Sequence, residues 1–118
     1  MDQRFVDKMN HTLLDLKQEI ITNLTNTNQE FKEILEGMDP KDQVDVASDD
    51  IDRRMMEAIG TQELKHLRLI DAAINRIRQG KYGLCAKCGK KIPKERLEAI
   101  PYAVLCIDCK AAEERRNR

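Results

Sequence analysis

The sequence predicts a mainly α-helical protein: a long antiparallel coiled-coil hairpin, then a small C-terminal domain with four cysteines and a terminal helix. Three observations lead to this prediction. Apolar residues recur at steps of three and four along two segments of similar length. A short segment that contains glycine and proline separates these two segments. All four cysteines of the 118-residue chain lie in two Cys-x-x-Cys pairs near its C-terminal end.

The first predicted helix covers residues 3–36. Its apolar stripe advances by three or four residues at a time, as the seam of a coiled coil does. Residues 23–28 are poor helix formers, so we expect a weak point in that stretch. The stripe consists of Val6, Met9, Leu13, Leu16, Ile20, Leu24, Thr27, Phe31 and Ile34.

Residues 37–48 are predicted to form a tip that joins the two helices. Gly37 is a common kind of helix end, and Asp39-Pro40 is a turn or helix-start signal. Asp39, Asp42 and Asp45 are all suitable caps for the next helix, and the sequence leaves the choice open.

The second predicted helix covers residues 46–79. Its seam consists of Met56, Ile59, Leu67, Ile70, Ile74 and Ile77, with a missing step at Glu63. Gly60 lies inside this helix at a cost of about 1 kcal/mol relative to alanine, and marks either a close helix approach or a weak point.

Each helix is long enough to span roughly 50 Å, and the short link between them predicts an antiparallel hairpin. We therefore divide the chain into a hairpin over residues 1–80, with its tip at about 37–48, and a zinc-finger domain over 81–118. Short helices are expected at 94–99 and 107–116.

The composition favours long exposed helices over a thick globular core. Charged residues make up 36% of the chain and aromatic residues 3%, with a formal net charge of zero. This balance gives no general case for nucleic-acid binding. The charge is polarised, however: residues 39–52 hold six aspartates against one lysine, and residues 76–96 hold eight basic residues against one glutamate. No run reaches the length of a membrane span, so we expect no membrane partner and a cytoplasmic protein.

The cysteine pairs predict one structural Zn²⁺ ion. The ligands would be Cys85, Cys88, Cys106 and Cys109. A gap of two residues lets both sulfurs of a pair turn toward one point, and two pairs supply four thiolates for a closed tetrahedral site. Glycines flank the first pair, as a tight knuckle often requires. The nearby Lys87, Lys90 and Lys91 offset the negative charge of four thiolates on a divalent ion.

Other uses of the cysteines fit less well. Disulfides suit secreted domains, yet residues 1–20 are charged throughout and lack the apolar core of a signal peptide. A thioredoxin-like site needs one pair beside a βαβ pattern, which is missing, and the spacing favours zinc over an iron–sulfur cluster. Since four sulfurs leave no open position on the metal, we expect no zinc catalysis.

The cysteine region resembles the signature of the DksA/TraR family. The chain begins close to its first helix, so we expect a short form. At the tip, Asp42-x-x-Asp45-x-Ala47 is also similar to a motif of the family. The matching residues run Cys85-x-x-Cys88-Gly89, then Ile92-Pro93-x-x-Arg96-Leu97-x-Ala99-x-Pro101-x-Ala103-x-x-Cys106-Ile107-Asp108-Cys109.

The resemblance implies a transcription regulator that binds RNA polymerase directly, without binding DNA, and is a monomer. In this family the acidic coiled-coil tip enters the secondary channel and alters promoter-complex stability and initiation, often with the alarmone ppGpp in the stringent response. By position, Asp42, Asp45 and Ala47 would be the functional tip residues. Lys110 would contact ppGpp, although Leu69 and Ile100 stand where the family has basic residues.

Two other functions stay open at this point. The basic stretch 76–96 would suit a zinc-finger DNA-binding protein, although no recognition helix is evident. The paired carboxylates of Asp42 and Asp45 would suit a transcript-cleavage accessory factor of RNA polymerase that holds a second Mg²⁺ ion.

Overall fold

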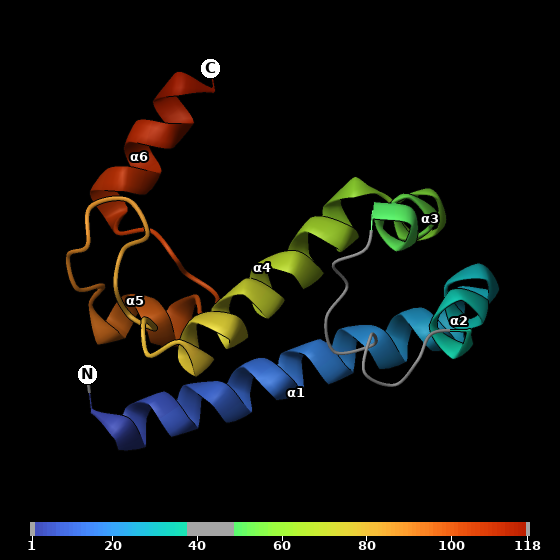
Figure 1. Ribbon diagram of the computed structural model, residues 1–118, viewed down its shortest axis with the longest axis horizontal. Coiled ribbons are helices and arrows are strands. Elements are labelled where there is room, and N and C mark those ends of the chain that lie inside the picture. Colours follow the sequence, from blue (N-terminus) through green and yellow to red (C-terminus); the bar gives the residue numbers. More distant parts are fainter. Residues whose placement is uncertain (1, 38–48, 118) are drawn as a thin grey trace. The chain divides into compact units, whose positions relative to one another are not determined.

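Helices make up most of the structure, a computed structural model that describes residues 2–37 and 49–117 (Figure 1). Within these ranges the chain forms six helices and no strand. No helix there is long and apolar enough to cross a membrane. The helices are α1 (Gln3–Thr27), α2 (Gln29–Glu36), α3 (Asp49–Ile59), α4 (Thr61–Arg78), α5 (Lys94–Ala99) and α6 (Ile107–Arg116).

The helices belong to two compact units. The hairpin unit is Leu14–Asp71, and the cysteine unit combines Met1–Leu13 with Ala72–Arg118. Each end of the chain thus contributes to the cysteine unit, because the first turns of α1 and the last turns of α4 belong to it. The domain boundary at residue 80 remains a prediction from the sequence.

The hairpin unit is antiparallel. The Lys17 ammonium donates to the Asp71 carboxylate at 2.5 Å, and the Asn28 amide donates to the Ala58 carbonyl at 2.8 Å. As the residue number rises on one side, it falls on the other, which is the predicted pairing. Beyond these contacts α2 packs against α3. The core of this part consists of Phe31, Ile34, Met55 and Leu64.

Each of the two predicted helices is broken once, at a position that the sequence offered as a weak point. Asn28 leaves the helical conformation, with φ −136° and ψ 103°, and separates α1 from α2. Gly60 has φ +86°, a left-handed conformation that favours glycine, and separates α3 from α4. Nothing lies within 4 Å of a Cβ placed on Gly60. Gly60 therefore marks a helix break and not a close helix approach.

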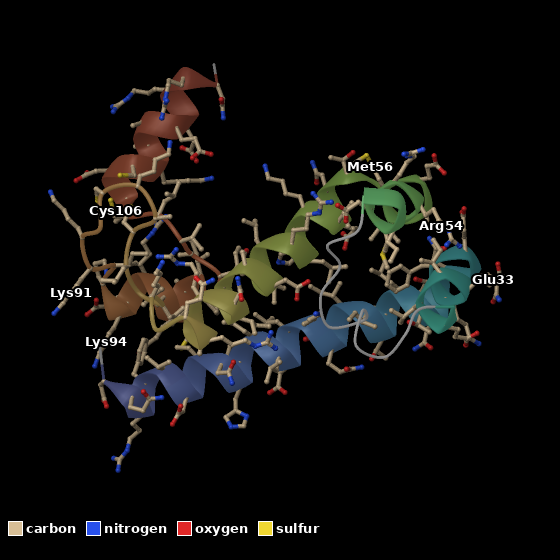
Figure 2. The ribbon with its side chains drawn as sticks, in the orientation of Figure 1. Glu33, Arg54, Met56, Lys91, Lys94 and Cys106 are labelled. Atoms are coloured by element: carbon tan, nitrogen blue, oxygen red, sulfur yellow. The ribbon has the colours of Figure 1, made fainter. Side chains whose placement is uncertain are left out.

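The break also changes which side chains of α3 and α4 face the core. Met55 is buried, whereas the predicted seam residue Met56 is 44% exposed and lies on the outer face of α3 (Figure 2). Leu64 is buried and fills the step that the sequence pattern left empty at Glu63. A change of phase at Gly60 explains the exposure of Met56, since the periodic pattern was counted as one helix. Leu64 lies three residues before Leu67, so it belongs to the seam of α4 itself.

The cysteine unit has its own apolar core. Helices α5 and α6 have the bounds predicted for them. The buried side chains come from α1, α4, α5 and the loops between them. They are Phe5, Met9, Leu13, Ala73, Ile74, Tyr82, Cys85, Ile92, Leu97 and Ala103.

Candidate metal centre

The first cysteine pair lies in a tight knuckle. The Cys85 N–H donates to the Lys90 carbonyl at 2.8 Å, and the Gly89 N–H donates to the Cys85 carbonyl at 3.0 Å. Leu84 and Lys91 form an antiparallel bridge across the base of this turn. Gly89 has φ +75°, so glycine is favoured where the chain turns back. These bonds hold Cys85 and Cys88 on one side of the loop.

The second pair begins the last helix. Cys106 caps α6, and its sulfur accepts the Cys109 backbone N–H at 3.4 Å. A helix N-terminus carries partial positive charge and favours a thiolate. The Ala86 N–H donates to the Val104 carbonyl at 2.8 Å, which links the two cysteine loops.

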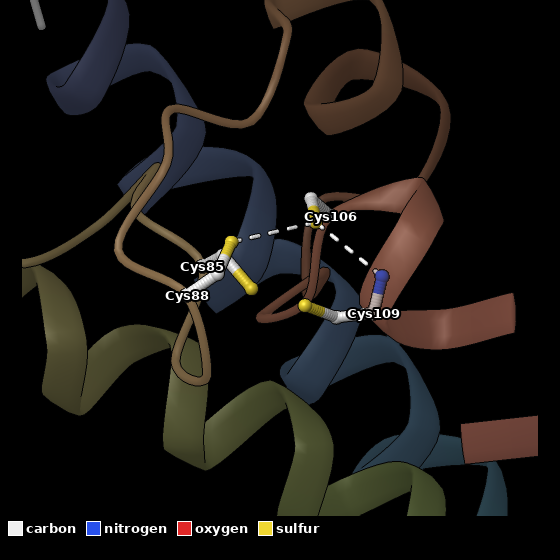
Figure 3. Close-up of side chains that lie close together, drawn as sticks. All are labelled: Cys85, Cys88, Cys106 and Cys109. Carbon is white, nitrogen blue, oxygen red and sulfur yellow. Dashed lines mark hydrogen bonds between the residues drawn. The ribbon is translucent and has the colours of Figure 1, made fainter. Parts of the chain in front are cut away.

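The four sulfurs gather at one point (Figure 3). All four lie within 4.8 Å of one another, and the Cys88 and Cys106 sulfurs are 3.7 Å apart. A tetrahedral Zn²⁺ ion with Zn–S bonds of about 2.3 Å requires sulfurs about 3.8 Å apart. The donor set and its spacing therefore fit a closed structural zinc site. Cys85 is buried, and Cys106 and Cys109 are partly buried.

Ionisation of the thiols is uneven. Hydrogen bonds from the backbone N–H groups of Cys106 and Cys88 lower the pKa of Cys85 to about 5. Hydrogen bonding to the side-chain sulfur of Cys106 raises the pKa of Cys109 to about 12. Four thiols so close together do not all ionise by themselves, and a divalent cation supplies the charge that makes four thiolates stable.

Two arginines bond to the loops that carry the cysteines. The Arg76 Nη2 donates to the Leu84 carbonyl at 2.7 Å and to the Lys81 carbonyl at 3.2 Å. The Arg96 Nε donates to the Leu105 carbonyl at 3.3 Å. The sequence assigned both to a basic run. Their position on predicted helices next to the cysteine loops indicated that they lie near the site, but nothing in the sequence indicated which carbonyls they bond to.

The lysines near the site are not equivalent. Lys87 pairs with Glu113 of α6 at 3.6 Å, so part of its charge is offset by that carboxylate. Lys91 is exposed on the loop that leads into α5, and Lys94 is exposed at the first residue of α5 (Figure 2). The Lys94 Nζ also lies 5.2 Å from the centroid of the Phe5 ring, above its face, in a cation–π arrangement.

The other predicted site residues divide into two groups. Asp42, Asp45 and Ala47 lie outside the described residues. Lys110 is exposed on α6, while Leu69 and Ile100 are partly buried. Arg68, next to Leu69, forms an ion pair with Asp52.

Comparison with known proteins identifies the family. The family model of the prokaryotic dksA/traR C4-type zinc finger matches residues 80–115, which include all four cysteines. The RNA polymerase-binding transcription factor DksA of Caulobacter vibrioides is 30% identical over 118 residues, 100% of this chain and 82% of that protein. The chain belongs to the DksA/TraR family.

Two further proteins are similar to this DksA/TraR family chain over nearly its whole length. An uncharacterized protein of Aquifex aeolicus is 31% identical over 99% of this chain and 81% of its own length. Among solved structures, transcription factor DksA2 from Pseudomonas aeruginosa is 34% identical, with a TM-score of 0.67 over 100% of this chain and 89% of that one. The coiled-coil and zinc-finger fold predicted from the sequence is thereby confirmed.

Proposed function

We propose that this DksA/TraR family chain is a transcription regulator that binds RNA polymerase directly and has no enzyme activity. One observation carries the proposal: similarity over the whole chain to a protein named for RNA polymerase binding and transcription control. The metal centre supports a non-enzymatic role. With sulfur at all four positions a bound Zn²⁺ ion would offer no site to water or substrate.

The finer mechanism concerns the acidic segment that joins α2 to α3 in the sequence. We propose that this segment enters the secondary channel of the polymerase and changes the stability of promoter complexes. Asp45 would contact basic groups of the polymerase or the network around its active-site metal, with Asp42 beside it. Ala47 would allow close approach. The antiparallel pairing of the two arms supports this, because Lys17 and Asn28 pair with Asp71 and Ala58, so the acidic segment joins in sequence two arms that run in opposite directions.

In vitro transcription from a ribosomal-type promoter tests this proposal. Wild type should change initiation, and Asp45→Asn should not, while its zinc content and helicity stay the same. Asp15→Asn, which removes one exposed charge from α1, is the matched control and should behave as wild type. A wild type without effect at saturating concentration would contradict the proposed function. Equal activity of Asp45→Asn and wild type would contradict the tip mechanism alone.

A role for ppGpp is a further part of the proposal. Lys110 is exposed and available to a phosphate, but Leu69 and Ile100 are apolar where the family resemblance implies basic side chains. We expect a weak response that Lys110→Ala abolishes. The same assay with and without ppGpp measures it, and an equal ppGpp effect in wild type and Lys110→Ala would exclude this lysine.

A gel-shift with duplex DNA should show no binding, since the proposed partner is the polymerase.

A further inference from the structure

The residue before each cysteine pair has a backbone carbonyl that accepts a hydrogen bond from an arginine side chain. Leu84 directly precedes Cys85, and its carbonyl accepts the 2.7 Å bond from Arg76. Leu105 directly precedes Cys106, and its carbonyl accepts the 3.3 Å bond from Arg96. The same arrangement therefore occurs at both knuckles, from two different helices.

We propose that Arg76 and Arg96 are positioning residues of the zinc centre. A carbonyl fixed at the residue before a ligand fixes the peptide plane that joins the two residues. That plane sets where the ligand's Cα–Cβ bond points, and hence where its sulfur lies. Hydrogen bonds from a charged guanidinium are stronger than those between neutral groups, and partners behind the ligands commonly tune a metal site.

The helices that carry these two arginines are packed firmly enough for them to position the cysteine loops. Arg76 lies on α4 between the buried residues Ala73 and Ile74 and the helix end, and Arg96 is next to Leu97, which is fully buried. Both side chains are partly buried and start from helices anchored in the core of the cysteine unit. A positioning group is most effective when its own backbone is held by packing.

Arginine is chemically suited to these contacts. One Arg76 nitrogen reaches two carbonyls of the loop, of Lys81 and Leu84, so it closes the loop as well as holding its end. The planar guanidinium presents its donors in a fixed arrangement, whereas a lysine ammonium is a compact charge on a flexible stem. The guanidinium charge also opposes the net charge of about −2 that four thiolates and Zn²⁺ produce.

The test measures metal retention in the full-length protein. Arg76→Met and Arg96→Met should each release Zn²⁺ to a chromogenic chelator about 10-fold faster than wild type, the lower end of the effect known for such partners. With Co²⁺ in place of Zn²⁺, their visible absorption should also shift, because the sulfurs no longer hold the same tetrahedral arrangement. Arg78→Met, an exposed change on α4, should match wild type in both measurements.

Two further variants separate positioning from other effects. Ile74→Val loosens the core of the cysteine unit without touching a knuckle, and should leave the Co²⁺ spectrum unchanged. Arg76→Lys keeps the charge, and should restore retention only in part. Full rescue by lysine would overturn the proposal in favour of a purely electrostatic effect. Wild-type release and spectra in both Met variants would also overturn it. If a Met variant fails to fold, the Arg76→Lys comparison still decides.

Discussion

The Tyr82 hydroxyl is held inside the cysteine unit. It donates to the Pro101 carbonyl at 2.8 Å, and the side chain is only 5% exposed. Loss of solvent around the phenol raises its pKa from 10.0 to about 12. The neutral form is favoured in the folded protein, so folding stability must depend on pH in the alkaline range.

We predict that the contribution of Tyr82 to the free energy of unfolding falls as pH rises from about 10 to about 12. Above pH 10 the unfolded chain loses this proton while the folded chain keeps it, which favours unfolding. Since the chain has two tyrosines, Tyr102→Phe isolates Tyr82 for an absorbance titration of tyrosinate. A midpoint near 10 in the folded variant would disprove the shift. Tyr82→Phe should lack this part of the pH dependence in denaturant unfolding.

At the scale of single residues, the metal ligands were predictable from the sequence because their spacing is strict. Two Cys-x-x-Cys pairs bring four sulfurs together in the structure because each gap of two residues fixes the local turn. The bonds from Arg76 and Arg96 were not predictable, since a basic residue in a charged run gives no sign of which carbonyl it will reach. Such contacts depend on how distant segments pack.

Among the helices, the Asn28 side chain bonds to both arms near their breaks. The Asn28 Oδ1 accepts the Phe31 N–H at 2.9 Å and caps α2, while its Nδ2 donates to the Ala58 carbonyl at 2.8 Å. Ala58 lies two residues before Gly60, where α3 has already ended. One amide thus satisfies a donor in its own arm and an acceptor in the other.

We predict that Asn28→Asp and Asn28→Ala differ in a way that separates the two bonds. Aspartate still caps α2 but has no donor for Ala58, whereas alanine loses both bonds. Alanine should lower the free energy of unfolding by about 1–2 kcal/mol, and aspartate by less. Urea unfolding measures both, with Asn23→Ala, an exposed residue of α1, as control. Equal losses in the two variants would mean that the link to Ala58 adds nothing.

The elements themselves were predictable to the extent that local signals define them. Proline and the cysteine turns delimit α5 and α6, and their bounds match the expected ones. The breaks at Asn28 and Gly60 were expected only as weak points, because apolar residues at helical spacing continue on both sides of each. Where α1 ends, the Asn28 side chain caps α2 and bonds to the opposite arm, and the second of these is a tertiary contact.

For the whole molecule, we predict that the metal supports one unit and not the other. The free energy of binding a structural Zn²⁺ ion contributes directly to the free energy of folding. Cys85→Ser or removal of zinc by a chelator should therefore unfold α5, α6 and the cysteine loops. The cluster around Phe31 and Met55 contains no metal ligand and should keep α2 and α3 protected. Hydrogen exchange along the chain measures this. Unchanged exchange in α5 and α6 after zinc removal would contradict the structural role of the metal.

The buried ion pair of the hairpin unit gives a fourth prediction. The side chains of Lys17 and Asp71 are 10% and 20% exposed, and their charged atoms are 2.5 Å apart. Lys17→Met leaves Asp71 without this partner and should cost about 3 kcal/mol of unfolding free energy. The double variant Lys17→Met with Asp71→Leu should recover most of that loss, because an apolar pair needs no compensating charge. A double variant as unstable as the single one would refute this explanation.

The same ion pair restricts how the two arms can align. Apolar seams tolerate sliding, because one leucine or isoleucine can replace another after a shift of one turn, about 5.4 Å. Such a shift in either direction separates Lys17 from Asp71, and in one direction it places Lys17 opposite the buried Leu67, which leaves a charge beside an apolar side chain. A wrongly aligned hairpin, or an arm borrowed from a second molecule out of register, would meet the same penalty. The pair thus selects one alignment of the two arms over alignments shifted by a turn.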